Sequence, residues 1–220
     1  MEIYLKTIVY IDGYNLYYGS LRKTLYKWLD IHHLFSNHIL TPDNKLAKVK
    51  YYTAPVLGKM CDDPKSPQRQ RTYLQALRKL YPDNVTIIEG KMIAMKQNRR
   101  NLNPPPEMVM VHHFEEKKSD VNIAVDILTD VFTQQCQHIV LCTNDSDLEP
   151  ALVKIRQLNP SIKIGLVSPI RSNDSRHVSK DLLQYADWHK FVKESHLQAS
   201  QLPDKIPHTS IKKPEDWVLK

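Results

Sequence analysis

Two carboxylates stand one residue apart, directly after a short apolar run. Asp145 and Asp147 follow residues 139–142, whose side chains (I-V-L-C) predict a short strand buried on both faces. Two acids in one turn raise each other's pKa unless a cation lies between them, so the pair can indicate a metal site. An acidic turn can equally cap the helix that is predicted to begin at Leu148. These residues alone leave both interpretations open.

Another carboxylate ends an apolar run near the beginning of the sequence. Residues 7–12 predict a second buried strand that finishes with Asp12, and Gly13 follows it. The carboxyl ends of parallel strands meet at one edge of a sheet. We therefore expect Asp12 to lie beside Asp145 and Asp147.

A third acidic element, E-K-K-S-D, comes directly before the longest predicted helix. Asp120 falls in the first turn of that helix, residues 119–135, where the helix dipole favours a carboxylate. If Asp120 were the only acid of interest, this stabilisation of the helix would be enough to explain its presence. Asp126 comes six positions later, about 120° away around the helix. Both cannot face one metal ion, and Asp120 is the better ligand candidate.

These acids are positioned by strands and helices that alternate along the chain. Further strands are predicted at residues 47–55, 85–88, 162–167 and, at the edge, 186–192; further helices are predicted at residues 16–25, 31–39, 64–80 and 180–185. The helix over residues 119–135 is predicted to bury a stripe made of Val121, Ala124, Val125, Leu128, Val131 and Phe132. The alternation predicts a three-layer α/β sandwich around a parallel sheet.

Two segments depart from this alternation. Residues 91–96 and 108–114 look like extended arms, which predicts an exposed β-hairpin flap over about residues 91–115. The flap carries the cations Lys91, Lys96, Arg99 and Arg100. From about residue 196 the sequence is polar and contains several prolines. We therefore expect a domain over residues 1–195 and an extended or disordered tail over residues 196–220, which Trp217 can dock back onto the domain.

Composition favours a polyanionic partner and excludes several classes of site. The 220 residues carry a net charge of +7, with a pI of about 9.2. Cys61, Cys136 and Cys142 form no C-x-x-C pair and are expected to be reduced thiols in a cytoplasmic protein. No apolar run is long enough to span a membrane and no signal-peptide pattern occurs. Neither the P-loop motif nor G-x-G-x-x-G is present.

Three motifs together resemble the NYN domain of the PIN-like nuclease superfamily. They are D-G-Y-N-L-Y-Y-G from Asp12, K-K-S-D ending at Asp120, and T-N-D-S-D-L-E-P from Thr143. Their order and spacing match the family over about residues 3–192, which includes the closing L-L-Q-Y-A-D-W-H-K-F-V. Two positions differ from the common pattern, because Lys118 stands where the family often has Gly and Leu148 where it often has an aromatic residue.

The resemblance implies a PIN-like sheet in the order 3-2-1-4-5 and an endoribonuclease that depends on Mg²⁺ or Mn²⁺. The metal-binding acids of the family correspond to Asp12, Asp120, Asp145 and Asp147. The family's orienting asparagine, counted among the catalytic residues, corresponds to Asn15. Mg²⁺ prefers carboxylate oxygens, and a metal-bound water of lowered pKa can attack a phosphodiester, so the residue types agree with this chemistry.

Basic and aromatic residues near the acids are candidates for binding RNA. Lys117, Lys118, Arg99 and Arg100 are expected to contact phosphates, and the Tyr14 ring to stack on a base. For each, a solvated surface charge or a core tyrosine is the competing interpretation. The sequence leaves the oligomeric state open. Two other functions remain as alternatives: a PIN-like module that binds RNA or protein without cutting, and a hydroxylase of pyridine-type compounds, as some NYN-like proteins have been assigned.

Overall fold

A parallel sheet forms the centre of the protein, which a computed structural model describes over residues 4–170 and 177–217. Within these residues six strands pair in the order β3-β2-β1-β6-β7-β8. Their bounds are β1 Leu5–Asp12, β2 Asn44–Thr53, β3 Val85–Glu89, β6 His138–Cys142, β7 Lys163–Ser168 and β8 Trp188–Phe191. The predicted order 3-2-1-4-5 is confirmed, with β6 and β7 as fourth and fifth strands and β8 added at the edge.

The two central strands bring distant parts of the chain together. β1 pairs with β6 in parallel from Thr7 opposite His138 to Ile11 opposite Cys142. β6 is buried along its whole length, as are the last six residues of β1, because helices cover both faces of the sheet. This register places Asp12 and Thr143 next to each other just beyond the paired residues.

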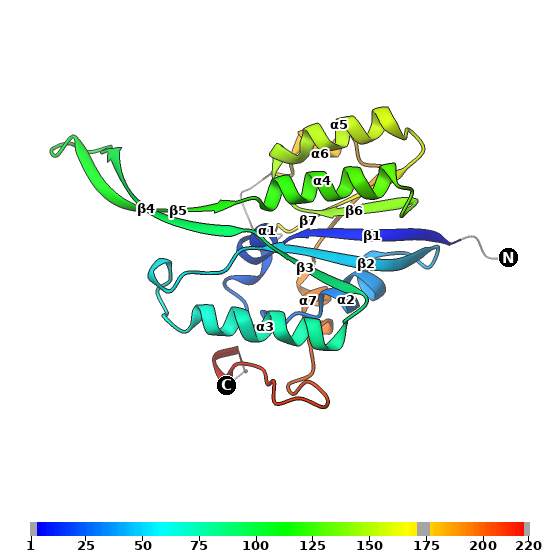
Figure 1. The fold of residues 1–220 in the computed structure, drawn as a ribbon, viewed down its shortest axis with the longest axis horizontal. Helices are drawn as coiled ribbons and strands as arrows, with labels where there is room; N and C mark the ends of the chain where they lie inside the picture. Colours follow the sequence, from blue (N-terminus) through cyan, green and yellow to red (C-terminus); the bar gives the residue numbers. More distant parts are fainter. Residues whose placement is uncertain (1–3, 171–176, 218–220) are drawn as a thin grey trace.

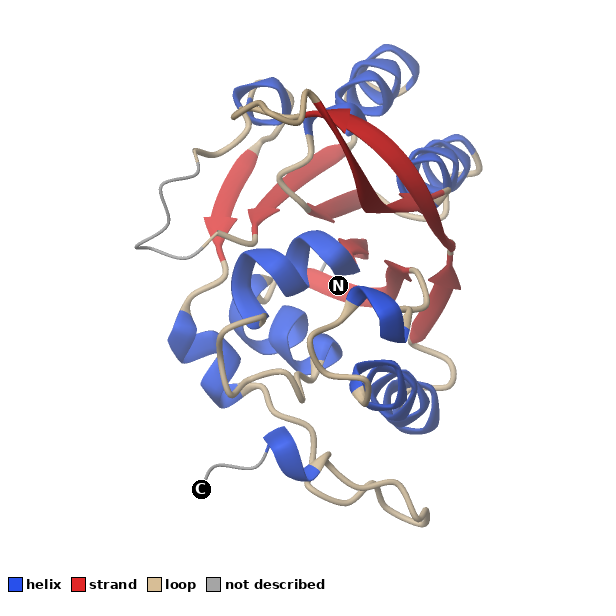
Figure 2. Cartoon of the chain, turned by 90° about the vertical axis from the view of Figure 1, so that its left-hand side faces the viewer, coloured by secondary structure: helices blue, strands red, loops and turns tan. Residues whose placement is uncertain are grey.

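Helices form a layer on each face of the sheet, as Figures 1 and 2 show. The bounds are α1 Gly13–Leu16, α2 Ile31–His33, α3 Ser66–Leu80, α4 Ser119–Phe132, α5 Glu149–Leu158, α6 Lys180–Leu183 and α7 Glu194–Ala199. α4, α5 and α6 cover one face, while α2, α3 and α7 lie on the other (Figure 1). Two π-helical turns, η1 (Tyr17–Leu21) and η2 (Leu34–Ile39), continue α1 and α2. No helix in the described ranges is long and apolar enough to cross a membrane.

The predicted buried stripe of α4 is wrong for three of its residues. Val121, Val125 and Phe132 are 66%, 55% and 75% exposed, whereas Ile123 and Ile127 are fully buried. The helix is rotated because its polar side chains also face the sheet. Asp126 and Asp130 lie on the inner side and bind side chains of the strands, as described below.

The expectation of an extended or disordered tail is also wrong for the described residues. α7 begins at Glu194, and the side chains of Leu197, Leu202 and Ile206 are almost fully buried in the same core as Val9 and Trp28. The ring of Trp217 lies 6.2 Å from that of Trp28. The apolar residues of the tail are few and do not follow a helical period. Each packs separately against the core that includes α3. Residues 218–220 lie outside the described part.

A long hairpin, the flap, projects from the body of the protein (Figure 1). Its strands are β4 (Lys91–Arg100) and β5 (Met108–Lys117), which pair antiparallel along their full length. β4 follows β3 after Gly90, and β5 leads into α4 within two residues. The base of the flap therefore adjoins the first turn of α4, where Asp120 lies.

Candidate metal centre

Asp12 ends β1 and caps the first turn of α1. Its Oδ1 accepts a hydrogen bond from the backbone N–H of Asn15 at 2.9 Å. Its Oδ2 accepts from the Asn15 side-chain amide at 3.0 Å and from the Thr143 hydroxyl at 3.1 Å. The turn packs against β2 so closely that a Cβ on Gly13 would lie 2.5 Å from the carbonyl oxygen of Tyr52. These contacts hold a buried carboxylate in one orientation.

Asn15 and Thr143 join the loop after β1 to the loop after β6. The Asn15 side-chain oxygen accepts from the backbone N–H of Asn144 at 3.2 Å, and the Thr143 hydroxyl accepts from that of Asp145 at 3.1 Å. Asp145 in turn accepts from the backbone N–H of Asp147 at 3.0 Å and caps the short helix η4. Thr143 was not singled out from the sequence, because a threonine after a strand is common.

Asp12, Asp120 and Asp145 converge into one group, the three-acid cluster. Each offers a carboxylate oxygen, and these oxygens all lie within 4.8 Å of one another. Burial, together with the charges of Asp12 and Asp145, raises the pKa of Asp120 to about 6. Burial and the charge of Asp145 also raise the pKa of Asp12, against its hydrogen bonds from Asn15 and Thr143. Three oxygen donors that repel one another fit a hard divalent cation, which would relieve the repulsion.

Asp147 lies outside the three-acid cluster. It is exposed in the first turn of η4, and its charge contributes only a smaller part of the raised pKa of Asp120. The structure thus brings together three of the four acids singled out from the sequence. Asp145 combines both roles that the sequence left open, since it caps a helix and belongs to the cluster.

The other acids of α4 serve the fold. Asp126 accepts from the Tyr52 hydroxyl, and Asp130 accepts from the Tyr10 hydroxyl, each at 2.7 Å. The Lys50 ammonium lies 2.7 Å from Asp130 and 3.6 Å from Asp126. A buried network of this kind fixes α4 on the sheet, since its members satisfy one another.

Glu116 is a site residue that the sequence analysis missed. It lies near the end of β5, half-buried, and accepts a hydrogen bond from the Ser119 hydroxyl. Burial, with smaller contributions from the charges of Asp12 and Asp120, raises the pKa of Glu116 to about 7. The available signal was its position four residues before Asp120, within the same acidic element.

The joint between the flap and α4 contains a residue in a strained conformation. Lys118 has φ 80° and ψ −19°, in the left-handed region that a side chain disfavours. This geometry explains in physical terms why a glycine suits the position. Lys117 pairs with Glu115 at the surface. Both lysines are exposed at the base of the flap, close in the chain to Asp120.

Lys118→Gly should stabilise the protein by about 1 kcal/mol relative to Lys118→Ala, because only glycine adopts this backbone conformation without cost. Both variants lose the same charge, so their difference isolates the backbone. The melting temperature, followed by circular dichroism, should be a few degrees higher for the glycine variant. Equal melting temperatures would show that the left-handed conformation carries no strain.

Arg99 and Arg100 lie far from the three-acid cluster. They end β4, eight and nine residues after Lys91, and each strand residue adds about 3.3 Å. The two arginines are therefore separated from the base of the flap by close to 30 Å along the hairpin. Arg100 forms an exposed ion pair with Glu107 at 3.3 Å. They can meet a long polyanion only at a distance from the cluster.

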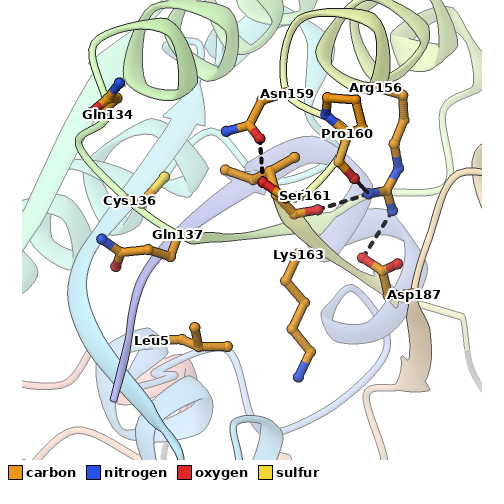
Figure 3. Close-up of a pocket in the computed structure, with 11 residues that line it drawn as sticks. Leu5, Gln134, Cys136, Gln137, Arg156, Asn159, Pro160, Ser161, Lys163 and Asp187 are labelled. Carbon is orange, nitrogen blue, oxygen red and sulfur yellow. Dashed lines mark hydrogen bonds and ion pairs between the residues drawn. The ribbon is translucent and has the colours of Figure 1, made fainter. Parts of the chain in front are cut away.

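A hollow in the described surface lies away from the acids. It has a volume of about 720 Å³ and is lined by residues at the opposite edge of the sheet, where β1, β6 and β7 begin (Figure 3). Its main cation, Arg156, already donates to Asp187 and to the carbonyl oxygens of Ile162 and Tyr185. These polar groups bind one another, and the hollow contains no cluster of acids.

The raised pKa values predict a pH dependence of stability. Asp120 and Glu116 hold protons in the folded state that the unfolded chain has already lost, between about pH 4 and their folded pKa values of about 6 and 7. Without metal, the free energy of unfolding should therefore fall as pH rises through this range. Thermal melts in EDTA should show a smaller fall for Asp120→Asn than for the unmodified chain. Mn²⁺ should restore stability at pH 7 and do so less at pH 5, where Asp120 is largely protonated. Parallel pH profiles of the two chains would contradict this account.

Comparisons with known proteins agree with the architecture. The NYN domain family matches residues 6–193. A Pseudomonas putida protein, named 6-hydroxy-3-succinoylpyridine 3-monooxygenase HspA, is 37% identical over 237 aligned residues, which cover 97% of this chain and 75% of that protein. A Vibrio parahaemolyticus protein of unknown function is 16% identical, with a TM-score of 0.52 over 92% of this chain and 99% of the other. This last likeness shows the fold alone. With the family match spanning most of its length, the chain belongs to the NYN domain family of the PIN-like superfamily.

Proposed function

We propose that the protein is a metal-dependent endoribonuclease. The observation that carries this proposal is the convergence of Asp12, Asp120 and Asp145 at the carboxyl edge of the sheet, in a chain of the NYN family. A Mg²⁺ or Mn²⁺ ion bound there would supply a water of lowered pKa and would neutralise charge on the phosphate. The residues around the cluster determine how such an ion and a substrate would be held.

Each neighbouring side chain has a role in this proposal. Asn15 and Thr143 orient Asp12 through their hydrogen bonds, so they act as positioning residues. Burial and the charges of Asp12 and Asp120 raise the pKa of Glu116 in the metal-free site, so a cation on the cluster would also favour the charged form of this carboxylate. The exposed Lys117 and Lys118 lie at the base of the flap, within three residues of Asp120 in the chain, and are proposed to bind a phosphate.

RNA in the cytoplasm is the proposed substrate and place of action. The net charge of +7 favours a polyanion, and the choice of RNA over DNA rests on the family. The proposal is tested by incubating the protein with mixed single-stranded and structured RNAs and Mn²⁺. Cleavage should stop in EDTA and in the Asp12→Asn variant. Tight binding without any cleavage would favour the non-cutting module instead.

A pyridine hydroxylase is the second candidate, favoured by the name of the 37% identical Pseudomonas putida protein. Such a reaction inserts one oxygen atom from O₂ into the substrate, and a two-electron reductant converts the other oxygen atom to water. Incubation with 6-hydroxy-3-succinoylpyridine, ¹⁸O₂ and NADH, followed by mass spectrometry, should show one ¹⁸O atom in a pyridine product if this candidate holds, whether or not the succinoyl group at position 3 is displaced. Product formation that survives Asp12→Asn would place that chemistry away from the three-acid cluster.

The flap is proposed to bind RNA without taking part in cleavage. Changing both Arg99 and Arg100 to Ala should weaken RNA binding and reduce the slope of log affinity against log salt by about 1 to 2, as the loss of two phosphate contacts does. Fluorescence anisotropy with a labelled RNA at several salt concentrations measures this. The cleavage rate at saturating RNA should stay unchanged. An unaltered salt slope would show that both arginines are solvated surface charges that do not contact RNA.

A further inference from the structure

A second hollow, the tyrosine cavity, is lined in part by the turn that follows Asp12. Its volume is about 290 Å³, close to the lower end of the range for small-ligand pockets. Six aromatic side chains contribute to its lining: Tyr14, Tyr17, Tyr18, Tyr51, Tyr73 and Trp217. Gly13 and Tyr14 follow Asp12 directly, and the charge of Asp12 raises the pKa of the Tyr51 hydroxyl, although burial is the larger cause. The cavity and the three-acid cluster are therefore neighbours.

Some of the aromatic rings that line the cavity are buried, and others are exposed to solvent. Tyr51 and Tyr73 are buried and contact each other edge to face, with centroids 6.4 Å apart. Tyr17 and Tyr18 are 37% and 46% exposed, and their rings also meet edge to face, at 5.2 Å. The Tyr14 ring lies 5.8 Å from that of Tyr18. Exposed rings beside a partly apolar cavity suit a flat ring that stacks on one of them.

Three cations line the wall, Arg22, Lys27 and Arg69, and within the described residues only Arg69 forms an ion pair. Arg69 is bound by Asp63 at 2.6 Å and by Asp216 at 2.8 Å, and the Arg22 guanidinium lies 5.3 Å from the centre of the Tyr18 ring. Lys27 is half-buried, and across residues 4–170 and 177–217 its ammonium has neither an ion pair nor a side-chain hydrogen bond. Asp62 also lines the cavity but is exposed. A half-buried ammonium without a partner favours an anion.

We propose that the tyrosine cavity binds a planar nitrogen heterocycle that carries an anionic group, and that its occupant is a nucleotide of the RNA adjacent to the cleaved bond. The base stacks on the exposed tyrosines and the phosphate pairs with Lys27. This inference rests on the proposed nuclease function for the identity of the ligand. Stacking on aromatic side chains is tolerant of base identity, so it would hold single-stranded RNA with little sequence preference.

Isothermal titration of the full chain with uridine 5′-monophosphate, in EDTA, tests the cavity apart from the metal centre. The nucleotide should bind saturably, while uridine binds about tenfold or more weakly and inorganic phosphate gives no heat at the same concentrations. Lys27→Met should weaken the nucleotide about tenfold or more, to the level of uridine. Lys79→Met, which removes an exposed charge at the far end of α3, is the matched control and should change nothing. Tyr18→Ala should weaken nucleotide and nucleoside alike.

Each contrary result has a definite meaning. Absence of saturable binding, or a nucleotide affinity that Lys27→Met leaves unchanged in a folded chain, overturns the proposal. Tighter binding of 6-hydroxy-3-succinoylpyridine than of the nucleotide overturns the nucleotide as occupant. Binding that depends on Lys27, in a protein that cuts no RNA, supports the cavity while the nuclease function fails. Cleavage that depends on Asp12, in a protein that binds no nucleotide in EDTA, shows the reverse.

Discussion

Asp120→Asn should lower the rate of Mn²⁺-dependent RNA cleavage by about 10³-fold, the size of effect expected when a group that stabilises the transition state electrostatically is lost. Asparagine keeps the shape of the side chain but removes one of the three charges that converge within 4.8 Å. Asp120 is only partly covered at the start of α4, so the metal-free variant should still fold, with the altered pH dependence described above. Single-turnover cleavage of a labelled RNA at saturating protein measures the effect directly.

Asp147→Asn is the matched control, because Asp147 is an equally charged, exposed aspartate that lies outside the three-acid cluster. Its charge acts on the cluster only from a greater distance, so cleavage should fall by about tenfold at most. The sequence predicts both Asp120 and Asp147 as metal ligands, and only the structure shows that Asp147 lies outside the cluster. Equal losses in the two variants would show that Asp147 joins the metal ligands when the site is loaded.

A chain that ends after Lys193 should fail to fold. It loses Leu197, Leu202 and Ile206, whose side chains are almost fully buried. Each buried aliphatic side chain stabilises by about 1.5–3 kcal/mol, so the three together approach the 5–15 kcal/mol that holds a typical domain folded. The buried Trp28 would also lose the carbonyl oxygen of Pro203, which accepts its indole N–H at 3.0 Å. Soluble yield and a cooperative melt by circular dichroism report the outcome.

A shorter deletion separates the core contacts of the tail from its last turn. A chain that ends after His208 keeps Leu197, Leu202 and Ile206 and loses Trp217 together with the contact of Asp216 to Arg69. It should fold and melt a few degrees lower, because Trp217 is only partly buried. If the chain ending after Lys193 melted cooperatively at the same temperature as the full chain, the burial of these residues would contribute nothing to stability.

The sheet could be predicted from the sequence because buried parallel strands have an unambiguous pattern. Residues 139–142 are a continuous apolar run that ends at polar residues, and residues 7–12 repeat this arrangement. Parallel pairing then places Asp12 beside the loop that holds Asp145, whatever the details of the helices. The approach of Asp12 to Asp145 at this edge follows from topology alone.

Features that depend on pairs of side chains could not be predicted in this way. Asp126 and Asp130 face the sheet because Tyr52, Tyr10 and Lys50 satisfy them there, which a hydrophobic pattern along one helix cannot reveal. The packing of the tail could not be predicted for a related reason, because its buried apolar residues are spaced without the period of a helix or a strand. The position of Glu116 four residues before Asp120 is a weak signal, and the hydrogen bond from Ser119 at the end of β5 shows that Glu116 lies near the cluster.

The flap also divides the chain into two pieces of similar length. Its turn, between Arg100 and Met108, is exposed and separates Asp12 on the first piece from Asp120 and Asp145 on the second. Exposed hairpin tips tolerate nicking, and β1 pairs with β6 across the division along five residues. A protein cut by trypsin at Arg99 or Arg100 should therefore remain one particle in gel filtration. Fragments expressed separately should complement each other, with the metal centre forming only where the two halves meet.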